Sequence, residues 1–193
     1  MPAAAHTSSR FLAPTLIACT LLATAAHAQQ SPPEARPSVY VQLSGAENST
    51  RALQGGLTWA WNPRWRWSWG DTPIDGYWDL GIAQWRFDAP GGGRDSITVL
   101  SFIPTFRFHT GGPGSAWFID AGLGGTWANE HFATTEKRFA TKFNFASQVG
   151  IGLRFGEQRS HELALRIQHV SNGGYKKPNP GDNFVQLRYA VRF

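Results

Sequence analysis

Cysteine, methionine and long apolar runs are scarce in this chain of 193 residues, which holds one Cys and one Met. A single Cys cannot form an internal disulfide, and no Cys pair is available for a zinc knuckle. Beyond the N-terminus no apolar stretch reaches the roughly 18 residues of a transmembrane helix. Disulfide-stapled folds, Cys-based zinc modules and helical membrane proteins are therefore excluded for the body of the chain.

Charged residues are few, at 16%, whereas aromatic residues are abundant, with nine Trp and thirteen Phe. The formal charge of +5 favours an anionic partner, either nucleic acid or an anionic membrane. No nucleic-acid module is recognisable in the sequence. The N-terminal residues described next also predict export from the cytoplasm, which argues against a nucleic-acid partner. The six His are scattered, so no metal site is expected.

The first 28 residues have the pattern of a secretory signal peptide. Arg10 precedes a mostly apolar stretch over 11–26, and an A-x-A cleavage site occupies 26–28. Cleavage there leaves 165 residues without Cys or Met and with a charge of +4. The lipobox-like segment that ends at Cys19 leaves a lipoprotein signal as the alternative. A Pro-rich lead-in over 29–37 follows, and we expect it to be extended.

From residue 38 onward, apolar residues recur at every second position between turn signals, which indicates β-strands. The separators contain turn formers, such as the Pro-Asn-Pro-Gly segment at 178–181. We expect eight strands, over residues 38–46, 51–61, 76–87, 96–109, 114–128, 140–155, 160–170 and 183–193.

The alternation fits either a soluble sheet with its apolar side inward or a membrane barrel with that side toward lipid. In the expected strand 140–155, Ser147 breaks the apolar set, and the opposite set mixes Asn, Ala, Gln, Gly and Arg. Small and polar residues of that kind suit a narrow lumen better than a water-facing surface. Several strands also exceed the about 9–11 residues of a tilted span. We predict an all-β fold, an eight-stranded antiparallel transmembrane β-barrel of the outer membrane formed by residues 38–193, too narrow for a pore.

Aromatic residues near strand ends support the membrane interpretation, because Trp and Tyr form girdles at membrane interfaces. The chain also ends on Phe193 after aromatic and aliphatic residues at alternate positions, which resembles the terminal strand of outer-membrane barrels. The residues assigned to the girdles are Trp59, Trp61, Trp65, Trp67, Trp69, Tyr77, Trp78 and Trp127.

His169 and Ser171 lie two positions apart, so they project from the same face of a strand. That face carries Leu165 and Ile167 and is the lipid-facing one. An esterase whose substrate lies in the bilayer needs a base and a hydroxyl there, because acyl chains then stay in the surrounding lipid. The alternative is a structural or adhesive barrel in which the pair is incidental.

The segment 169–179 (HVSNGGYKKPN) resembles the signature H-x-S-N-x-G-x-K-x-P-N of the outer-membrane lipid A 3-O-deacylases, the PagL family. Segments 57–59 and 76–81 resemble that family's second and third strands, and the resemblance extends over essentially the whole mature chain. It implies a barrel that removes the 3-position hydroxyacyl chain of lipid A by serine-dependent ester hydrolysis, without a cofactor. Lipopolysaccharide and outer-membrane lipids are the implied partners; the sequence does not distinguish a monomer from a homodimer.

The resemblance also implies residue roles. Ser171 is the expected nucleophile, and His169 the general base and then the general acid. Asn172 matches a family residue that helps to hold the oxyanion through its amide groups. Glycines at 173 and 174 let the backbone turn, and Asn179 is either a motif residue or a turn former.

The expected third member of the triad departs from the family. Members carry an acidic residue fourteen positions after the histidine, and Asn183 stands there. Strict alternation points the neighbouring Asp182 into the lumen. A bulge at 180–181 shifts the register so that Asp182 reaches His169; without it, Asn183 orients the ring as a neutral acceptor. We predict Asp182, with Asn183 as the alternative.

A second enzymatic candidate is a phospholipid esterase. Outer-membrane phospholipase A also places His, Ser and a neutral Asn at similar spacing on a barrel exterior, although on twelve strands. Basic residues near the membrane faces either pair with lipid A phosphates or are solvated loop charges. These residues are Arg64, Arg66, Lys176 and Lys177.

Overall fold

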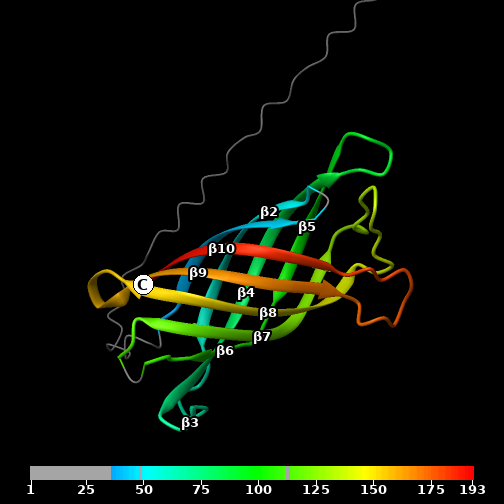
Figure 1. The fold of residues 1–193 in the computed structure, drawn as a ribbon. Helices are drawn as coiled ribbons and strands as arrows, with labels where there is room; N and C mark the ends of the chain where they lie inside the picture. Colours follow the sequence, from blue (N-terminus) through cyan, green and yellow to red (C-terminus); the bar gives the residue numbers. More distant parts are fainter. Residues whose placement is uncertain (1–35, 48, 112–113) are drawn as a thin grey trace, which may run out of the picture.

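The computed structural model describes residues 36–47, 49–111 and 114–193, which form a closed antiparallel sheet (Figure 1). The predicted signal peptide over 1–28, with Cys19, and most of the lead-in over 29–37 lie outside the described residues. Within the described part of the chain, no helix is long and apolar enough to cross a membrane.

The barrel closes because β1 pairs with both β2 and β10, and β2 pairs with β4. β5 and β6 continue one wall across a break at Ile103 and Pro104, and β3 is a short extension paired to β4. The described residues therefore make eight walls. Their segments are β1 (Ser38–Ala46), β2 (Arg51–Ala60), β3 (Trp67–Trp69), β4 (Thr72–Asp88), β5 (Arg94–Phe102), β6 (Thr105–Phe108), β7 (Trp117–Ala128), β8 (Phe143–Phe155), the 3-10 turn η2 (Glu157–Arg159), β9 (His161–Ser171) and β10 (Asp182–Arg192).

The predicted eight-stranded antiparallel barrel is confirmed, and each predicted strand is present with its ends displaced by a few residues at most. The Trp-rich segment β3 was not expected as a strand. It extends β4 because Trp67 pairs with Ile74 and Trp69 with Thr72.

The outer surface of the barrel is apolar. On β9, Leu163, Leu165 and Ile167 are 44–56% exposed, while the residues between them are buried. Soluble monomers rarely expose a continuous apolar belt of this kind, so the belt is a lipid-facing surface. This excludes the soluble-sheet alternative.

Exposed aromatic side chains occupy the strand ends, with Trp59, Trp67 and Trp127 between 39% and 55% exposed. Tyr77 is an exception. It is buried in the lumen, where its hydroxyl donates to Asp120 (2.7 Å). The prediction that Tyr77 belongs to a girdle is wrong, because its position on β4 points inward.

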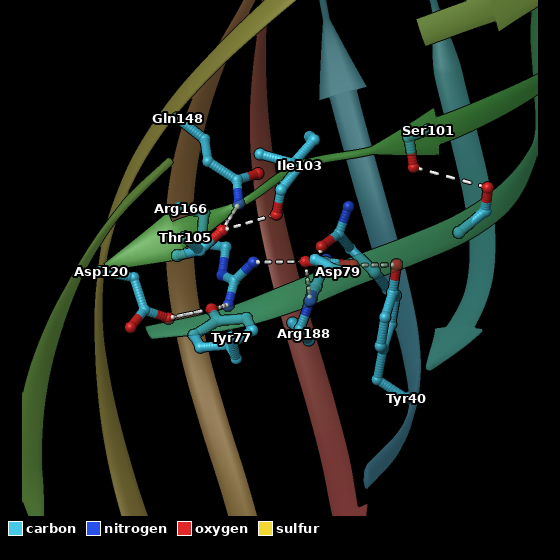
Figure 2. A network of polar contacts seen from close by, with 12 residues as sticks. Tyr40, Tyr77, Asp79, Ser101, Ile103, Thr105, Asp120, Gln148, Arg166 and Arg188 are labelled. Atoms are coloured by element: carbon cyan, nitrogen blue, oxygen red, sulfur yellow. Dashed lines mark hydrogen bonds and ion pairs between the residues drawn. The ribbon is translucent and has the colours of Figure 1, made fainter. Parts of the chain in front are cut away.

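A network of buried ion pairs fills the middle of the lumen (Figure 2). Arg166 donates from Nη1 to Asp79 (3.3 Å) and from Nη2 to Asp120 (2.8 Å), so it joins two walls of the barrel. Arg188 donates to Asp79 (2.5 Å), and Tyr40 donates to the other oxygen of that carboxylate (2.8 Å). The interior is therefore occupied by paired side chains, as expected of so small a barrel.

Aromatic rings close the end of the barrel opposite the C-terminus. This is the right-hand end in Figure 1. The loop 129–142 between β7 and β8 places Phe132 and Phe139 there, with their ring centroids 5.1 Å apart. Phe132 also contacts Trp85 (5.5 Å) and Phe87 (4.8 Å) of β4. The loop is thereby packed over the lumen.

Candidate active site

His169 and Ser171 lie on the outer face of β9, at the C-terminal end of the strand, directly before the loop 172–181. His169 is exposed and Ser171 is half-buried, whereas Val170 between them is fully buried. The alternation of β9 therefore continues to its end, and the two side chains share the lipid-facing side as predicted.

Asn183 stands opposite His169 in the register of β10 and β9. Its Oδ1 lies 2.8 Å from His169 Nδ1. Because an amide oxygen only accepts, the proton of this hydrogen bond belongs to Nδ1; in the neutral ring this tautomer has its lone pair on Nε2, which can then act as a base.

Asp182 occupies a different place from the predicted one. It pairs with Val170 in the register, is 1% exposed and faces the lumen. Its Oδ1 accepts hydrogen bonds from Lys137 Nζ (2.8 Å) and from the Asn183 backbone (3.1 Å). The prediction that a bulge turns Asp182 toward His169 is therefore wrong, because β10 keeps its alternation from its first residue.

Lys137 joins the loop 129–142 to two other elements, since Nζ also donates to Glu47 in the turn after β1 (2.9 Å). Burial lowers the pKa of Lys137, but its hydrogen bonds with Asp182 and Glu47 outweigh burial and raise it. Its ammonium hydrogen bond also lowers the pKa of Glu47. The loop that covers the lumen is thus attached by charge beside the candidate site.

Asn172 organises the loop 172–181. It is fully buried; its backbone N–H donates to Asn179 Oδ1 (2.9 Å) and its Nδ2 to the Lys176 carbonyl (2.8 Å). Its Oδ1 accepts from the Gly174 N–H (2.9 Å). The amide groups predicted to hold an oxyanion are thus used within the loop, and Asn179 secures Asn172.

Three glycines shape this loop. Gly173 and Gly174 have positive φ angles of 67° and 83°, which bears out their expected role in turning the backbone. Gly181 also has a positive φ of 67°, and a Cβ placed on it lies 2.8 Å from His169 Cε1 and 3.6 Å from Ser171 Cβ. The loop backbone therefore passes directly against the pair.

β8 provides the other border of the site. Phe145 pairs with Ser171 and Ser147 with His169, and both side chains are exposed. Phe145 also lines an outward-facing groove of about 560 Å³, formed with Phe102, Leu123 and other residues over the wall of β5, β7 and β8. An apolar groove thus begins beside the serine.

The predicted basic residues divide between the two ends of the barrel. Lys176 and Lys177 are exposed in the loop 172–181. Arg64 and Arg66 follow β2 at the opposite end, where Arg66 pairs with Asp75 (3.1 Å). One lipid phosphate cannot meet both sets. Among the residues that the structure describes, there is no cluster of three or more His, Cys, Asp or Glu suited to a metal.

Sequence reasoning missed two features of the site. Lys137 lies 45 positions from Asp182, and no motif connects them. Phe145 looked like an ordinary member of the apolar set. Ser147, by contrast, was detectable because it interrupts that set on β8.

Comparison with known proteins is consistent with this geometry. A family model described as lipid A 3-O-deacylase (PagL) matches residues 53–192. A curated relative named lipid A deacylase PagL from Pseudomonas aeruginosa is 32% identical over 154 residues, covering 80% of this chain and 84% of its own length. A protein of the same name from Bordetella bronchiseptica is 32% identical over 178 residues, covering 90% and 92%.

Solved structures show the same architecture. A crystal structure described as the outer membrane enzyme PagL superposes with a TM-score of 0.67 and 26% identity, covering 81% of this chain and 99% of that one. A designed transmembrane β-barrel superposes with a TM-score of 0.52 at 13% identity, which supports the fold alone.

Proposed function

The chain belongs to the lipid A 3-O-deacylase (PagL) family, and we propose that it removes the 3-position acyl chain of lipid A in the outer membrane by serine-dependent ester hydrolysis. The observation that carries this proposal is the hydrogen bond between Asn183 Oδ1 and His169 Nδ1 beside Ser171 on the lipid-facing surface. An oriented base next to a hydroxyl is the minimum for nucleophilic ester cleavage.

Ser171 Oγ attacks the ester carbonyl carbon while His169 Nε2 takes its proton. The tetrahedral intermediate then expels the sugar oxygen, which receives that proton from His169, and an acyl-serine forms. Water attacks the carbonyl carbon of the acyl-serine with His169 again as base; the bond from that carbon to Ser171 Oγ then breaks, Oγ takes the proton back from His169, and the fatty acid leaves. The surroundings of Gly181 support these steps. A Cβ built on Gly181 would lie 3.3 Å from His169 Nε2 and 3.6 Å from Ser171 Cβ, so the side chains of His169 and Ser171 are neighbours.

Asn183 is the proposed orienter. It holds the imidazole in the tautomer that leaves Nε2 free, but it is neutral and stabilises the imidazolium less than a carboxylate does. We assign the oxyanion to a backbone N–H of the loop that follows Ser171. The N–H groups of Asn172 and Gly174 are already donated within the loop, so Gly173 is the candidate donor. Asn172 positions that loop.

The surroundings suit a lipid substrate. The apolar groove that begins at Phe145 can take an acyl chain without exposing it to water. Lys176 and Lys177 are placed to meet phosphate groups of the lipid head. We infer that this end faces the cell exterior, because it carries the long loop 129–142 and outer-membrane barrels have their longer loops outside.

A phospholipid esterase is the second candidate, because Asn183 provides a neutral orienter of the kind found in outer-membrane phospholipase A. The test supplies the purified, folded barrel with lipid A or with a diacyl phospholipid and identifies the fatty acid released. The proposal expects a 3-hydroxy fatty acid from lipid A and little release from phospholipid. Release from phospholipid alone establishes the second candidate instead, and release from neither supports a structural barrel.

A further inference from the structure

Ser147 of β8 interrupts the apolar outer surface of the barrel directly beside the proposed catalytic pair. It stands opposite His169 in the register of β8 and β9, on the side of His169 away from Asn183. Its side chain is exposed, and within the described part of the chain its hydroxyl has no hydrogen-bond partner. A hydroxyl without a partner on an apolar surface is unfavourable, so its expected partner is a polar group of the lipid that lies against it.

Polar side chains are rare on the outer faces of β8, β9 and β10. At the end of these strands near the C-terminus, His161 Nδ1 lies 2.7 Å from the hydroxyl of Tyr189. The other polar members of the outward sets of these three described strands are neighbours of one another, namely Asn183, His169, Ser171 and Ser147. The first three are assigned to the proposed reaction, and only Ser147 is left without a role in it.

Ser147 also provides the lowest crossing of β8 between the proposed nucleophile and the apolar groove. Leu123, which lines the groove, stands opposite Ser147 on β7. The neighbouring outward residues of β8 carry larger side chains. The ring of Phe145 leans toward the loop after β9, since a Cβ built on Gly173 lies 3.4 Å from its Cδ2. An acyl chain can therefore cross β8 over Ser147 and enter the groove at Leu123.

We propose that Ser147 binds the hydroxyl of the 3-hydroxyacyl chain and so makes the site specific for hydroxylated chains, an inference that rests on the deacylase activity proposed above. Ser171 and Ser147 are diagonal neighbours across β9 and β8, at a separation of about 7–8 Å. An ester carbonyl poised for attack lies about 3–3.5 Å from the serine oxygen. The chain hydroxyl is attached to the second carbon beyond that carbonyl, so a hydrogen bond of about 2.7–2.8 Å can bridge the remaining distance to Ser147 Oγ.

The test compares two lipid A analogues that differ only in the 3-position acyl chain, which either carries the 3-hydroxyl or lacks it. Deacylation by the folded, detergent-solubilised barrel gives kcat/KM for each analogue. The parent should favour the hydroxylated analogue about tenfold, the effect of one hydrogen bond. Ser147→Ala should bring the two values close to each other through a loss on the hydroxylated analogue, because its side chain offers no donor or acceptor.

Val149→Ala is the matched control, because it also shortens an exposed side chain on the outer face of β8. It should keep the preference of the parent for the hydroxylated analogue. Equal kcat/KM values of the parent for both analogues, an undiminished preference in Ser147→Ala, or the same loss of preference in Val149→Ala overturns this inference and leaves the deacylase in place. Release of fatty acid from neither analogue by the parent overturns the proposed function and this inference together.

Discussion

Asn183 Oδ1 accepts a hydrogen bond from His169 Nδ1 at 2.8 Å, from the position directly across the β9–β10 pairing. In the proposed mechanism the orienter of the base is therefore an amide, while the acid beside it, Asp182, is held inside the lumen by Lys137. The proposed catalytic groups thus lie on the outer face of the barrel, and the ion pair that attaches the loop 129–142 lies on the inner face.

This arrangement predicts opposite effects of two substitutions. Asn183→Ala should lower kcat at least about tenfold, because the imidazole loses its orienting bond. Asn183→Asp should raise kcat about tenfold, because a carboxylate also stabilises the imidazolium. Steady-state deacylation by folded protein measures both. Full activity of Asn183→Ala contradicts the assigned role.

Gly181→Ala should abolish most activity while the barrel still folds. The added methyl lies 2.8 Å from His169 Cε1, so the ring must move. Gly92→Ala is the matched control: Gly92 also has a positive φ, but a Cβ there meets nothing within 4 Å. Both should lose about 1–2 kcal/mol of stability from the backbone strain. Equal activities of the two variants argue against the close approach of the loop.

Lys137→Met should destabilise the barrel by about 3 kcal/mol, because it leaves the buried carboxylate of Asp182 without its cation. Lys142 of the same loop donates to the Asn129 carbonyl (2.5 Å), and Lys142→Met should cost much less. Denaturant unfolding of the two variants makes the comparison. Similar losses of unfolding free energy in the two variants would contradict a stabilising role of the Lys137–Asp182 ion pair.

The contact of Glu47 with Lys137 should depend on pH. The hydrogen bond from Lys137 holds the pKa of Glu47 below its ordinary 4.5. An acid with a lowered pKa stabilises the folded state above its unfolded pKa, and that contribution disappears as pH falls through the lowered value. The parent should therefore unfold at a higher temperature than Glu47→Gln at neutral pH and at the same temperature in strong acid. A difference that persists unchanged in acid shows that the charge of Glu47 is not its cause.

The barrel could be predicted from the sequence because one face of every wall is apolar. Apolar residues therefore recur at every second position along each strand. The same parity correctly pointed Asp182 inward. The error was to suppose that a register slip at Gly181 would override it. Gly181 instead uses its positive φ to bring the loop against His169.

What the sequence did not predict depends on contacts between distant segments. Phe132 and Phe139 lie in a loop whose sequence has no regular apolar spacing. Over the lumen, Phe132 nevertheless contacts Trp85 and Phe87, and Phe139 contacts Phe132. Lys137 finds Asp182 and Glu47 only once the sheet has closed. Such contacts form when the barrel closes and brings separate loops to one end. The spacing of residues within a single segment therefore cannot predict them.

The role of Ser171 is tested most directly by the mass of lipid A from cells that make either the parent protein or Ser171→Ala, with equal folding confirmed for both. The parent should lower the lipid A mass by one hydroxyacyl chain. Ser171→Ala should leave the mass unchanged, whereas Ser96→Ala, at an exposed position of β5, should act like the parent. Removal of the chain by Ser171→Ala to the same extent as by the parent contradicts a serine-dependent deacylase.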